Sequence, residues 1–406
     1  MTRRVAVIGA GAAGTMAAIF AAESGADVLL LERTRDGGRK ILISGGGRCN
    51  VLPSAVDESR FVTDSSPNTL RKIVRGWPLA EQVRFFEQEL GIPLVEETAS
   101  AKLFPASHRA RDVRDGLLAY AAARGVALRT DTMVTDLQPV AGAWRIQLAA
   151  AAELDVDAVI VATGGLSVPN TGSDGTGLRV MERLGHTMHR TYAALTPLTA
   201  EPAPFAALSG VSLPVTLTAH SDVRESTATG GFLFTHHGYS GPSVLDVSHV
   251  AVRARADASS ARVSVRWTSL GDDEVESVLR PHGTRTVLGA VRTLVPDRLA
   301  SRLLEQASVD PTRSLAELPR EERRRLLDVL LRGALPWTGD EGYRKAEVTG
   351  GGVSLSEIDS RTMESRRHPG LFLCGEVLDA FGPIGGYNFL WAWATGRAAG
   401  RGVAPR

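Results

Sequence analysis

The residues best suited to chemistry stand near the beginning of the chain. An apolar run at 5–8 leads directly into Gly9, Gly11 and Gly14, which have the spacing G-x-G-x-x-G. Between a strand and a helix, these glycines permit a tight turn, close approach of a diphosphate and close helix packing. Glu32 ends a second apolar run, about 20 residues farther on, where a carboxylate can accept hydrogen bonds from ribose hydroxyls. The pattern predicts a dinucleotide site.

A second group of polar residues surrounds three consecutive glycines, Gly45 to Gly47. Lys40 and Arg48 flank these glycines and could neutralise a phosphate or a substrate anion. Ser44 and Asn50 add further donors. Glycines in this number fit a backbone that passes close to a flat or charged ligand, and a flexible surface loop is the alternative.

Two later segments repeat the pattern of an apolar strand that ends in glycine. One ends at Thr163 and Gly164, and the other ends at Gly375 and Glu376. A glycine loop then leads into a helix near residue 386, and a helix N-terminus stabilises negative charge, for instance on a reduced flavin ring. The glycines of residues 172–177 could mark a second phosphate loop, but no strand directly precedes them. We interpret this stretch as a tight turn into a helix near the cofactor.

The elements that position these residues indicate an α/β fold. A chain of 406 residues predicts two or three domains. Strand and helix patterns alternate up to residue 190, with one long helical pattern at 67–91, and resume at residue 350. We expect a discontinuous Rossmann-like domain formed by residues 1–190 and 350–406. Short alternating runs predict a β-rich insert at 191–270 and 333–349, with a helical insertion at 271–332.

Composition excludes several classes of function. The net charge is +1 with no basic stripe, so no nucleic-acid partner is expected. No apolar stretch reaches the length of a transmembrane helix, so no membrane is expected and a cytoplasmic protein is predicted. The two cysteines, Cys49 and Cys374, form no CxxC motif, and we expect no redox disulfide and no metal site. The oligomeric state does not follow from the sequence.

Several long motifs resemble one family of bacterial flavoproteins. They are VIGAGAAG at 7–14, SGGGRCN at 44–50, ATGGLSVPNTGSDGTG at 162–177, FLFTHHGYSGPSVL at 232–245 and TMESRRHPGLFLCGEVLDAFGPIGGYNFLWAWATG at 362–396. The chain resembles the BaiN-like FAD-dependent oxidoreductases, which include aminoacetone-oxidase-like proteins. The resemblance implies a discontinuous FAD-binding Rossmann-like domain, interrupted by a β-barrel-like domain that carries a small helical insertion.

The resemblance also implies which residues hold FAD, and because no motif demands a histidyl or cysteinyl bond, we expect FAD to be bound without a covalent link. The diphosphate loop and the adenosine end would be contacted by Gly9, Gly11, Ala12, Ala13, Gly14, Glu32, Arg33 and Val134. The riboflavin side would be lined by Lys40, Ser44, Gly45, Gly46, Gly47, Arg48, Cys49 and Asn50, with Thr163 and Gly164 nearby. The ribityl chain and ring would be held by Gly375, Glu376, Gly386, Tyr387, Asn388, Phe389 and Leu390. After Asn50 the sequence departs from the usual motif, which affects local substrate contacts.

Three functions are compatible with this site. The first is hydride transfer between the flavin N5 and a small organic substrate, with NAD(P)H as a transient co-substrate, and the second is an oxidase that acts on an amine. The third is an RNA-modifying flavoprotein, which the near-zero charge disfavours. His236 could exchange a proton and Arg48 could hold an anionic or carbonyl group. Alternatively, His236 only caps a turn and Arg48 only pairs with an FAD phosphate.

Overall fold

The chain folds into two compact units in a computed structural model, which describes residues 2–149 and 151–404. The first unit contains residues 1–192 and 347–406, and the second contains residues 193–346. The chain therefore passes twice between the units. Residues 347–349, which the sequence pattern placed in the insert, belong to the first unit.

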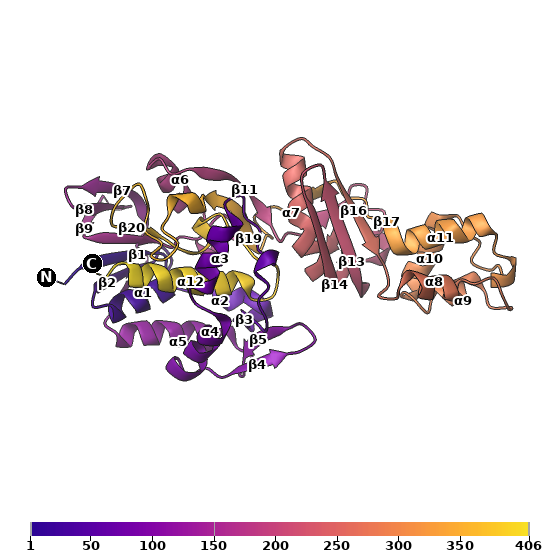
Figure 1. Cartoon of the computed structure of the whole chain (residues 1–406), viewed down its shortest axis with the longest axis horizontal. Coiled ribbons are helices and arrows are strands. Elements are labelled where there is room, and N and C mark those ends of the chain that lie inside the picture. Colours follow the sequence, from indigo (N-terminus) through magenta and orange to yellow (C-terminus); the bar gives the residue numbers. More distant parts are fainter. Residues whose placement is uncertain (1, 150, 405–406) are drawn as a thin grey trace. The chain divides into compact units, whose positions relative to one another are not determined.

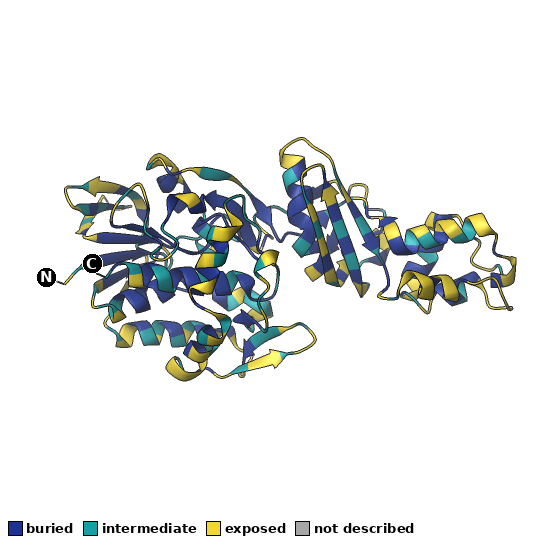
Figure 2. Ribbon diagram, viewed as in Figure 1, coloured by how far each residue is buried: buried dark blue, intermediate teal, exposed yellow. Residues whose placement is uncertain are grey.

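A five-stranded parallel sheet forms the centre of the first unit (Figure 1). Its strand order is β20-β10-β1-β2-β6, and every neighbouring pair is parallel. The strands are β1 (Arg4–Ile8), β2 (Asp27–Leu31), β6 (Ala127–Arg129), β10 (Ala158–Val161) and β20 (Leu371–Leu373). The central strands are continuous apolar runs because they are covered on both faces, and they are dark in Figure 2. The predicted Rossmann-like α/β fold is confirmed.

Glycines of the last helix let it pack closely against the first helix of the unit. Helix α12 (Tyr387–Gly402) lies beside α1 (Ala12–Glu23) in Figure 1. A Cβ at Gly396 or Gly400 would lie 2.4 Å from a carbonyl oxygen of α1, so only glycine permits this approach. Further helices of this unit are α2 (Arg39–Ile43), α3 (Pro67–Arg75), α4 (Leu79–Arg84), α5 (Ala110–Ala123) and α6 (Thr176–Arg183).

The single helical pattern expected at 67–91 is two helices and a π-turn. Helix α3 ends before Gly76, and α4 begins after Pro78. The two helices are separate because proline disfavours helical backbone at the residue before it. Small antiparallel sheets complete the unit: β3 (Leu52–Pro53), β4 (Leu94–Glu97) and β5 (Lys102–Pro105) form one, and β7 (Val134–Val140), β8 (Ala143–Leu148) and β9 (Glu153–Val156) form another. Strand β11 (Met188–Ala194) pairs with β19 (Val348–Val353).

The second unit is built on a seven-stranded antiparallel sheet. The order is β17-β16-β13-β14-β15-β12-β18. The strands are β12 (Leu198–Thr199), β13 (Ser212–Ser221), β14 (Glu225–Phe234), β15 (Gly238–Ser240), β16 (Ala261–Arg266), β17 (Gly333–Ala334) and β18 (Gly339–Asp340). Burial alternates along β13, which places one face of the strand in the core with α7 (Pro242–Ala256) (Figure 2).

Four helices extend this second core. They are α8 (Asp272–Val278), α9 (Val287–Val291), α10 (Asp297–Ala307) and α11 (Arg320–Arg332). Their buried residues, such as Leu303 and Leu330, join the same hydrophobic cluster as Trp267 next to the sheet. The helical insertion and the sheet therefore share one core. Within residues 2–149 and 151–404, no helix is both long and apolar enough to cross a membrane.

Candidate functional site

A large pocket opens in the first unit, where β1, β10 and β20 end. Its empty volume is about 1650 Å³, its open mouth included. In parallel α/β sheets, ligands bind beyond the carboxyl ends of the strands, as this pocket does. The predicted residues that line it are Gly9, Gly11, Ala12, Ala13, Glu32, Arg33, Lys40, Ser44, Asn50, Val134, Thr163, Gly164, Gly375, Glu376, Gly386, Asn388 and Phe389.

The three fingerprint glycines have different roles. Gly9 has φ +100°, and a Cβ there would lie 2.6 Å from the Ala162 carbonyl oxygen. A Cβ at Gly14 would lie 1.8 Å from the Gly9 carbonyl oxygen. Gly11 precedes α1 and lines the pocket, and among the described residues no atom lies within 4 Å of the position of its Cβ. Gly9 and Gly14 thus permit the fold, whereas Gly11 leaves space for a ligand at the N-terminus of α1.

Glu32 connects the second strand to the glycine loop. Its carboxylate accepts hydrogen bonds from Ala10 N at 2.9 Å, Thr34 N at 2.9 Å and Thr34 Oγ1 at 2.7 Å. The oxygen that faces Ala10 retains one acceptor position, since each carboxylate oxygen accepts about two hydrogen bonds. Arg33 beside it pairs with Asp174, from the loop at 172–177. This end of the pocket can therefore accept ribose hydroxyls.

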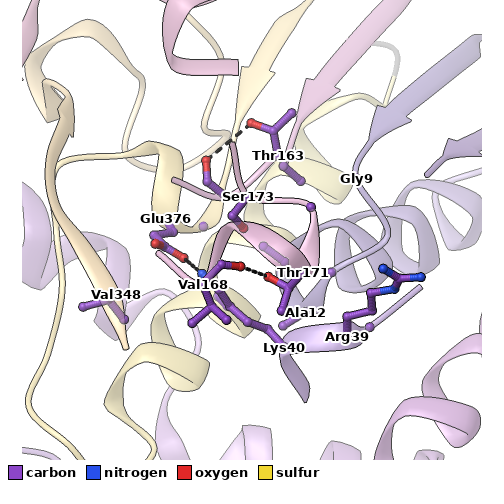
Figure 3. Close-up of a pocket in the computed structure, with 18 of the residues that line it drawn as sticks. Gly9, Ala12, Arg39, Lys40, Thr163, Val168, Thr171, Ser173, Val348 and Glu376 are labelled. Atoms are coloured by element: carbon purple, nitrogen blue, oxygen red, sulfur yellow. Dashed lines mark hydrogen bonds and ion pairs between the residues drawn. The ribbon is translucent and has the colours of Figure 1, made fainter. Parts of the chain in front are cut away.

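A partly buried charged network, centred on Lys40 and Glu376, lines the pocket as well (Figure 3). Lys40 Nζ donates to Glu376 Oε2 and to Ser167 Oγ, both at 2.6 Å. Glu376 Oε1 accepts from Ser167 Oγ at 2.6 Å and from Thr349 N at 2.9 Å. Burial alone would raise the pKa of Glu376, but the Lys40 ammonium and these hydrogen bonds lower it. Four segments distant in sequence are thereby joined at the ligand site.

The triple-glycine loop contributes only its two ends to the pocket. Ser44 and Asn50 line it, whereas Gly45, Gly46, Gly47, Arg48 and Cys49 are not among the described lining residues. The Arg48 guanidinium donates to Glu97 at 2.8 Å and lies 4.3 Å from the centre of the Phe104 ring. Arg48 is therefore held by a carboxylate and an aromatic ring of the small β3-β5-β4 sheet. Its catalytic role stays a prediction.

The N-terminus of α12 closes the opposite wall. Gly386 has φ +94°, and a Cβ there would lie 2.4 Å from the backbone of Leu52. The Asn388 amide accepts from Gly382 N and donates to Gly382 O, both at 2.9 Å, which fixes the loop before the helix. Tyr387 and Leu390 are buried, and the Tyr387 hydroxyl donates to the carbonyl of Ala55. These two residues support the wall from behind.

The two cysteines and His236 lie in different surroundings. Cys49 and Cys374 are free and buried. Burial raises the pKa of Cys49 to about 12 and raises that of Cys374 as well. His236 belongs to the second unit, where it is exposed in the turn between β14 and β15. Its role also stays a prediction.

Sequence patterns missed part of the lining. The missed residues include Thr34, Asp36, Gly38, Arg39, Ile43, Thr132, Met133, Val168, Thr171, Gly172, Ser173, Asp174, Thr176, Glu347, Val348, Phe381, Ile384 and Gly385. The stretch 172–177 was interpreted as a turn near the cofactor, and it does line the pocket. Glu347 and Val348 were missed because the pattern placed them in the insert.

The residues of this pocket fit a dinucleotide. A small-residue helix N-terminus, a carboxylate for ribose and a second helix N-terminus follow one another along its walls. The model for the HI0933-like protein Rossmann domain matches residues 3–402. The chain belongs to this HI0933-like family. The flavoprotein resemblance and the FAD-dependent oxidoreductase class are therefore confirmed.

Relatives of this HI0933-like chain are similar over nearly its whole length. The "Ribosomal RNA dihydrouridine synthase" of Escherichia coli is 32% identical over 400 residues, which cover 96% of this chain and 95% of the relative. The "3-dehydro-bile acid delta(4,6)-reductase" of Clostridium scindens is 31% identical and is matched over 99% of each chain. The solved 3-ketosteroid delta1-dehydrogenase of Sterolibacterium denitrificans has a TM-score of 0.55 at 13% identity, covering 99% of this chain and 100% of that one, so it shares the fold.

Proposed function

We propose that this chain is a FAD-dependent reductase that adds hydrogen across a C=C bond conjugated to a carbonyl group of a small organic substrate. NAD(P)H is the proposed electron donor. The observation that carries the proposal is the pocket, whose walls fit a dinucleotide and which is also lined by the Lys40–Glu376 pair and by the first residues of α12. Bound FAD would supply hydride chemistry at its isoalloxazine ring.

The names of the relatives support this bond type. Dihydrouridine differs from uridine by two hydrogens across a C=C bond conjugated to a carbonyl, and the name 3-dehydro-bile acid delta(4,6)-reductase indicates reduction of C=C bonds at positions 4 and 6, which are conjugated with the 3-ketone. The two substrates are otherwise dissimilar. Their shared chemistry therefore supports a conjugated C=C bond and not one particular molecule.

The residues of the pocket have defined tasks in this proposal. Glu32 would accept hydrogen bonds from the ribose of bound FAD, and the space at Gly11 would admit its diphosphate. Lys40 and Glu376 fix their part of the pocket wall through their ion pair. The N-terminus of α12 favours negative charge on the ring, because its first N–H groups have no partner within the helix.

A uracil base of RNA is the second candidate substrate. Two relatives, from Escherichia coli and Haemophilus influenzae, carry the name ribosomal RNA dihydrouridine synthase, at 32% and 30% identity. This candidate disagrees with the expectation that the chain binds no nucleic acid, which was based on its net charge of +1. A cytoplasmic location, which suits either substrate, stays a prediction.

The test is turnover of the purified yellow protein with each class of substrate. NADH and NADPH are supplied separately without oxygen, with a 3-oxo-4,6-diene steroid, a simple cyclic enone or ribosomal RNA as acceptor. We expect NAD(P)H oxidation that requires an enone, and a product heavier by two hydrogens. Reduction of RNA alone would favour the second candidate. In a separate assay in air, oxygen consumption with an amine such as aminoacetone, by a protein that reduces no enone and no RNA, would contradict both candidates and support an oxidase.

A further inference from the structure

Five carboxylates line the pocket, and one of them differs from the rest. Glu32 is held by Ala10 and Thr34, and the other three with partners pair with cations: Asp36 with Arg39, Asp174 with Arg33 and Glu376 with Lys40. Glu347 is the fifth. Within the residues that the structure describes, no hydrogen bond or ion pair joins its side chain to another group.

The pKa of Glu347 also differs from those of the paired carboxylates, because no cation pairs with it. Hydrogen bonding to Arg39 lowers the pKa of Asp36, and pairing with Arg33 outweighs burial to lower that of Asp174. The surrounding protein raises the pKa of Glu347, although the ammonium groups of Lys40 and Lys102 act in the opposite direction. Its side chain is nevertheless exposed, because it faces the open pocket. A ligand that fills the pocket would remove more water from this carboxyl and favour its neutral form further.

The position of Glu347 is fixed by its neighbours in β19. Thr349 Oγ1 accepts from Leu166 N at 2.7 Å and from Ser167 N at 3.1 Å, and Thr349 N donates to Glu376. Figure 3 shows Val348, the next residue, beside Glu376 and across the pocket from Arg39. A dinucleotide with its adenosine at Glu32 and its diphosphate at Gly11 would leave its second half for the remaining lining, of which Glu347 is a part.

The lining offers few alternatives for proton transfer. Among its described residues there is no histidine, tyrosine or cysteine. The Lys40 ammonium is engaged by Glu376 and Ser167. Lys102 is not a lining residue; its Cε would lie 3.3 Å from a Cβ at Gly385, so its stem runs behind the wall. Glu347 is therefore the acid in this pocket with a free, protonatable carboxyl group.

We propose that Glu347 is the proton donor of the reaction. The proposal rests on the proposed function, the reduction of a conjugated C=C bond with NAD(P)H as reductant. A hydride forms a C–H bond at the carbon remote from the carbonyl, and the C=C electron pair shifts toward the carbonyl oxygen. The carboxyl of Glu347 gives its proton to the other carbon and becomes a carboxylate. Solvent reaches the exposed side chain through the pocket mouth and returns the proton.

The first experiment follows the carboxyl itself and needs no turnover. Infrared difference spectra of the FAD-loaded protein are recorded across a pH titration, for the unchanged protein, Glu347→Gln and the control Glu96→Gln. Glu96 is an exposed carboxylate on β4, outside the described lining. We expect a protonated carboxyl band that titrates above the usual range, persists in the control and is lost in Glu347→Gln. Lys102→Met should move its titration to higher pH, because Lys102 lowers the pKa of Glu347. A band that persists in Glu347→Gln would overturn the proposal.

The second experiment separates the two half-reactions. Glu347→Gln should keep its FAD and its rate of flavin reduction by NAD(P)H, while reoxidation of the flavin by an enone slows by about 10²-fold or more. Glu347→Asp should retain part of the rate at which an enone reoxidises the flavin, and Glu96→Gln should retain all of it. Unchanged reoxidation in Glu347→Gln would overturn proton donation even if the band is lost. If no enone reoxidises the unchanged protein, the proposed function fails and the proton donation fails with it, whereas the infrared band reports on Glu347 in either case.

Discussion

Lys40 Nζ lies 2.6 Å from Glu376 Oε2, which joins residues that are 336 positions apart in the chain. Lys40 lies in α2 and Glu376 lies three residues after the end of β20, so the pair connects the first and the last segment of the discontinuous unit. Both side chains are mostly shielded from solvent, at 27% and 16% exposed. The pair therefore both holds the two segments together and forms part of the pocket wall.

Removal of Lys40 should destabilise the protein. In Lys40→Met the Glu376 carboxylate loses its cation; breaking a fully buried pair in this way costs about 3–5 kcal/mol of the free energy of unfolding, and this mostly shielded pair should lose up to that amount. The measurement is denaturant unfolding at pH 7, with Arg75→Met as control, since Arg75 forms an exposed pair with Glu58. The control should change stability by about 1 kcal/mol or less. Equal losses in the two variants would contradict a structural role for the buried pair.

The same variant should respond to pH with a definite sign. The pKa of Glu376 is lowered in the native protein, so the pair contributes stability above the pKa of the unfolded chain and loses it as pH falls through the folded pKa. Without Lys40, burial raises the pKa of Glu376. The stability difference between Lys40→Met and the unchanged protein should then be largest near neutral pH and shrink on acidification. A difference that is constant from neutral to acidic pH would contradict the assignment.

Gly11 and Gly14 should give different phenotypes when each is replaced by valine. The Cβ position of Gly11 is open and faces the pocket, so Gly11→Val should fold but purify without FAD. In Gly14→Val a Cβ would lie 1.8 Å from the Gly9 carbonyl, so this variant should fail to fold. Circular dichroism and the flavin absorbance of the purified proteins distinguish the two cases. A yellow Gly11→Val protein would show that the diphosphate does not lie there.

The two thiols should be inert. Cys49 and Cys374 are buried with raised pKa values, so neither forms a thiolate near neutral pH. A thiol reagent should modify neither residue in the native protein and both after denaturation. Replacement of both cysteines by serine should leave flavin reduction largely intact. Loss of turnover with FAD retained would show that the cysteines take part in the chemistry.

Much of the fold could be predicted because the signals are local. Apolar runs that end in glycine identified β1, β10 and β20, and the fingerprint identified the loop before α1. Long-range pairing could not be predicted, since the sequence does not show that Arg48 meets Glu97 or that Lys40 meets Glu376. Glu347 was missed for a related reason: a lone acid at a domain boundary has no local pattern, and only the folded chain places it in the pocket.

The catalytic role of His236 is the prediction that the sequence supports least directly. If His236 exchanges the proton, His236→Ala should keep its FAD and its protonated Glu347 band while the rate of hydride transfer between substrate and flavin falls by about 10²-fold, whereas proton donation by Glu347 predicts an unchanged rate. His237 is its exposed neighbour in the same turn and serves as the matched control. An unchanged rate in His236→Ala would leave His236 with a structural role in the turn between β14 and β15.

The most direct test of the proposed function bypasses the electron donor. The flavin of the purified protein is reduced by light without oxygen and is then mixed with a conjugated cyclic enone, while the return of the yellow absorbance is followed. We expect reoxidation at a rate that saturates with enone concentration and yields one saturated product per flavin, heavier by two hydrogens. A flavin that stays reduced with enones and with uracil-containing RNA, but is reoxidised promptly when oxygen is admitted, would contradict the account.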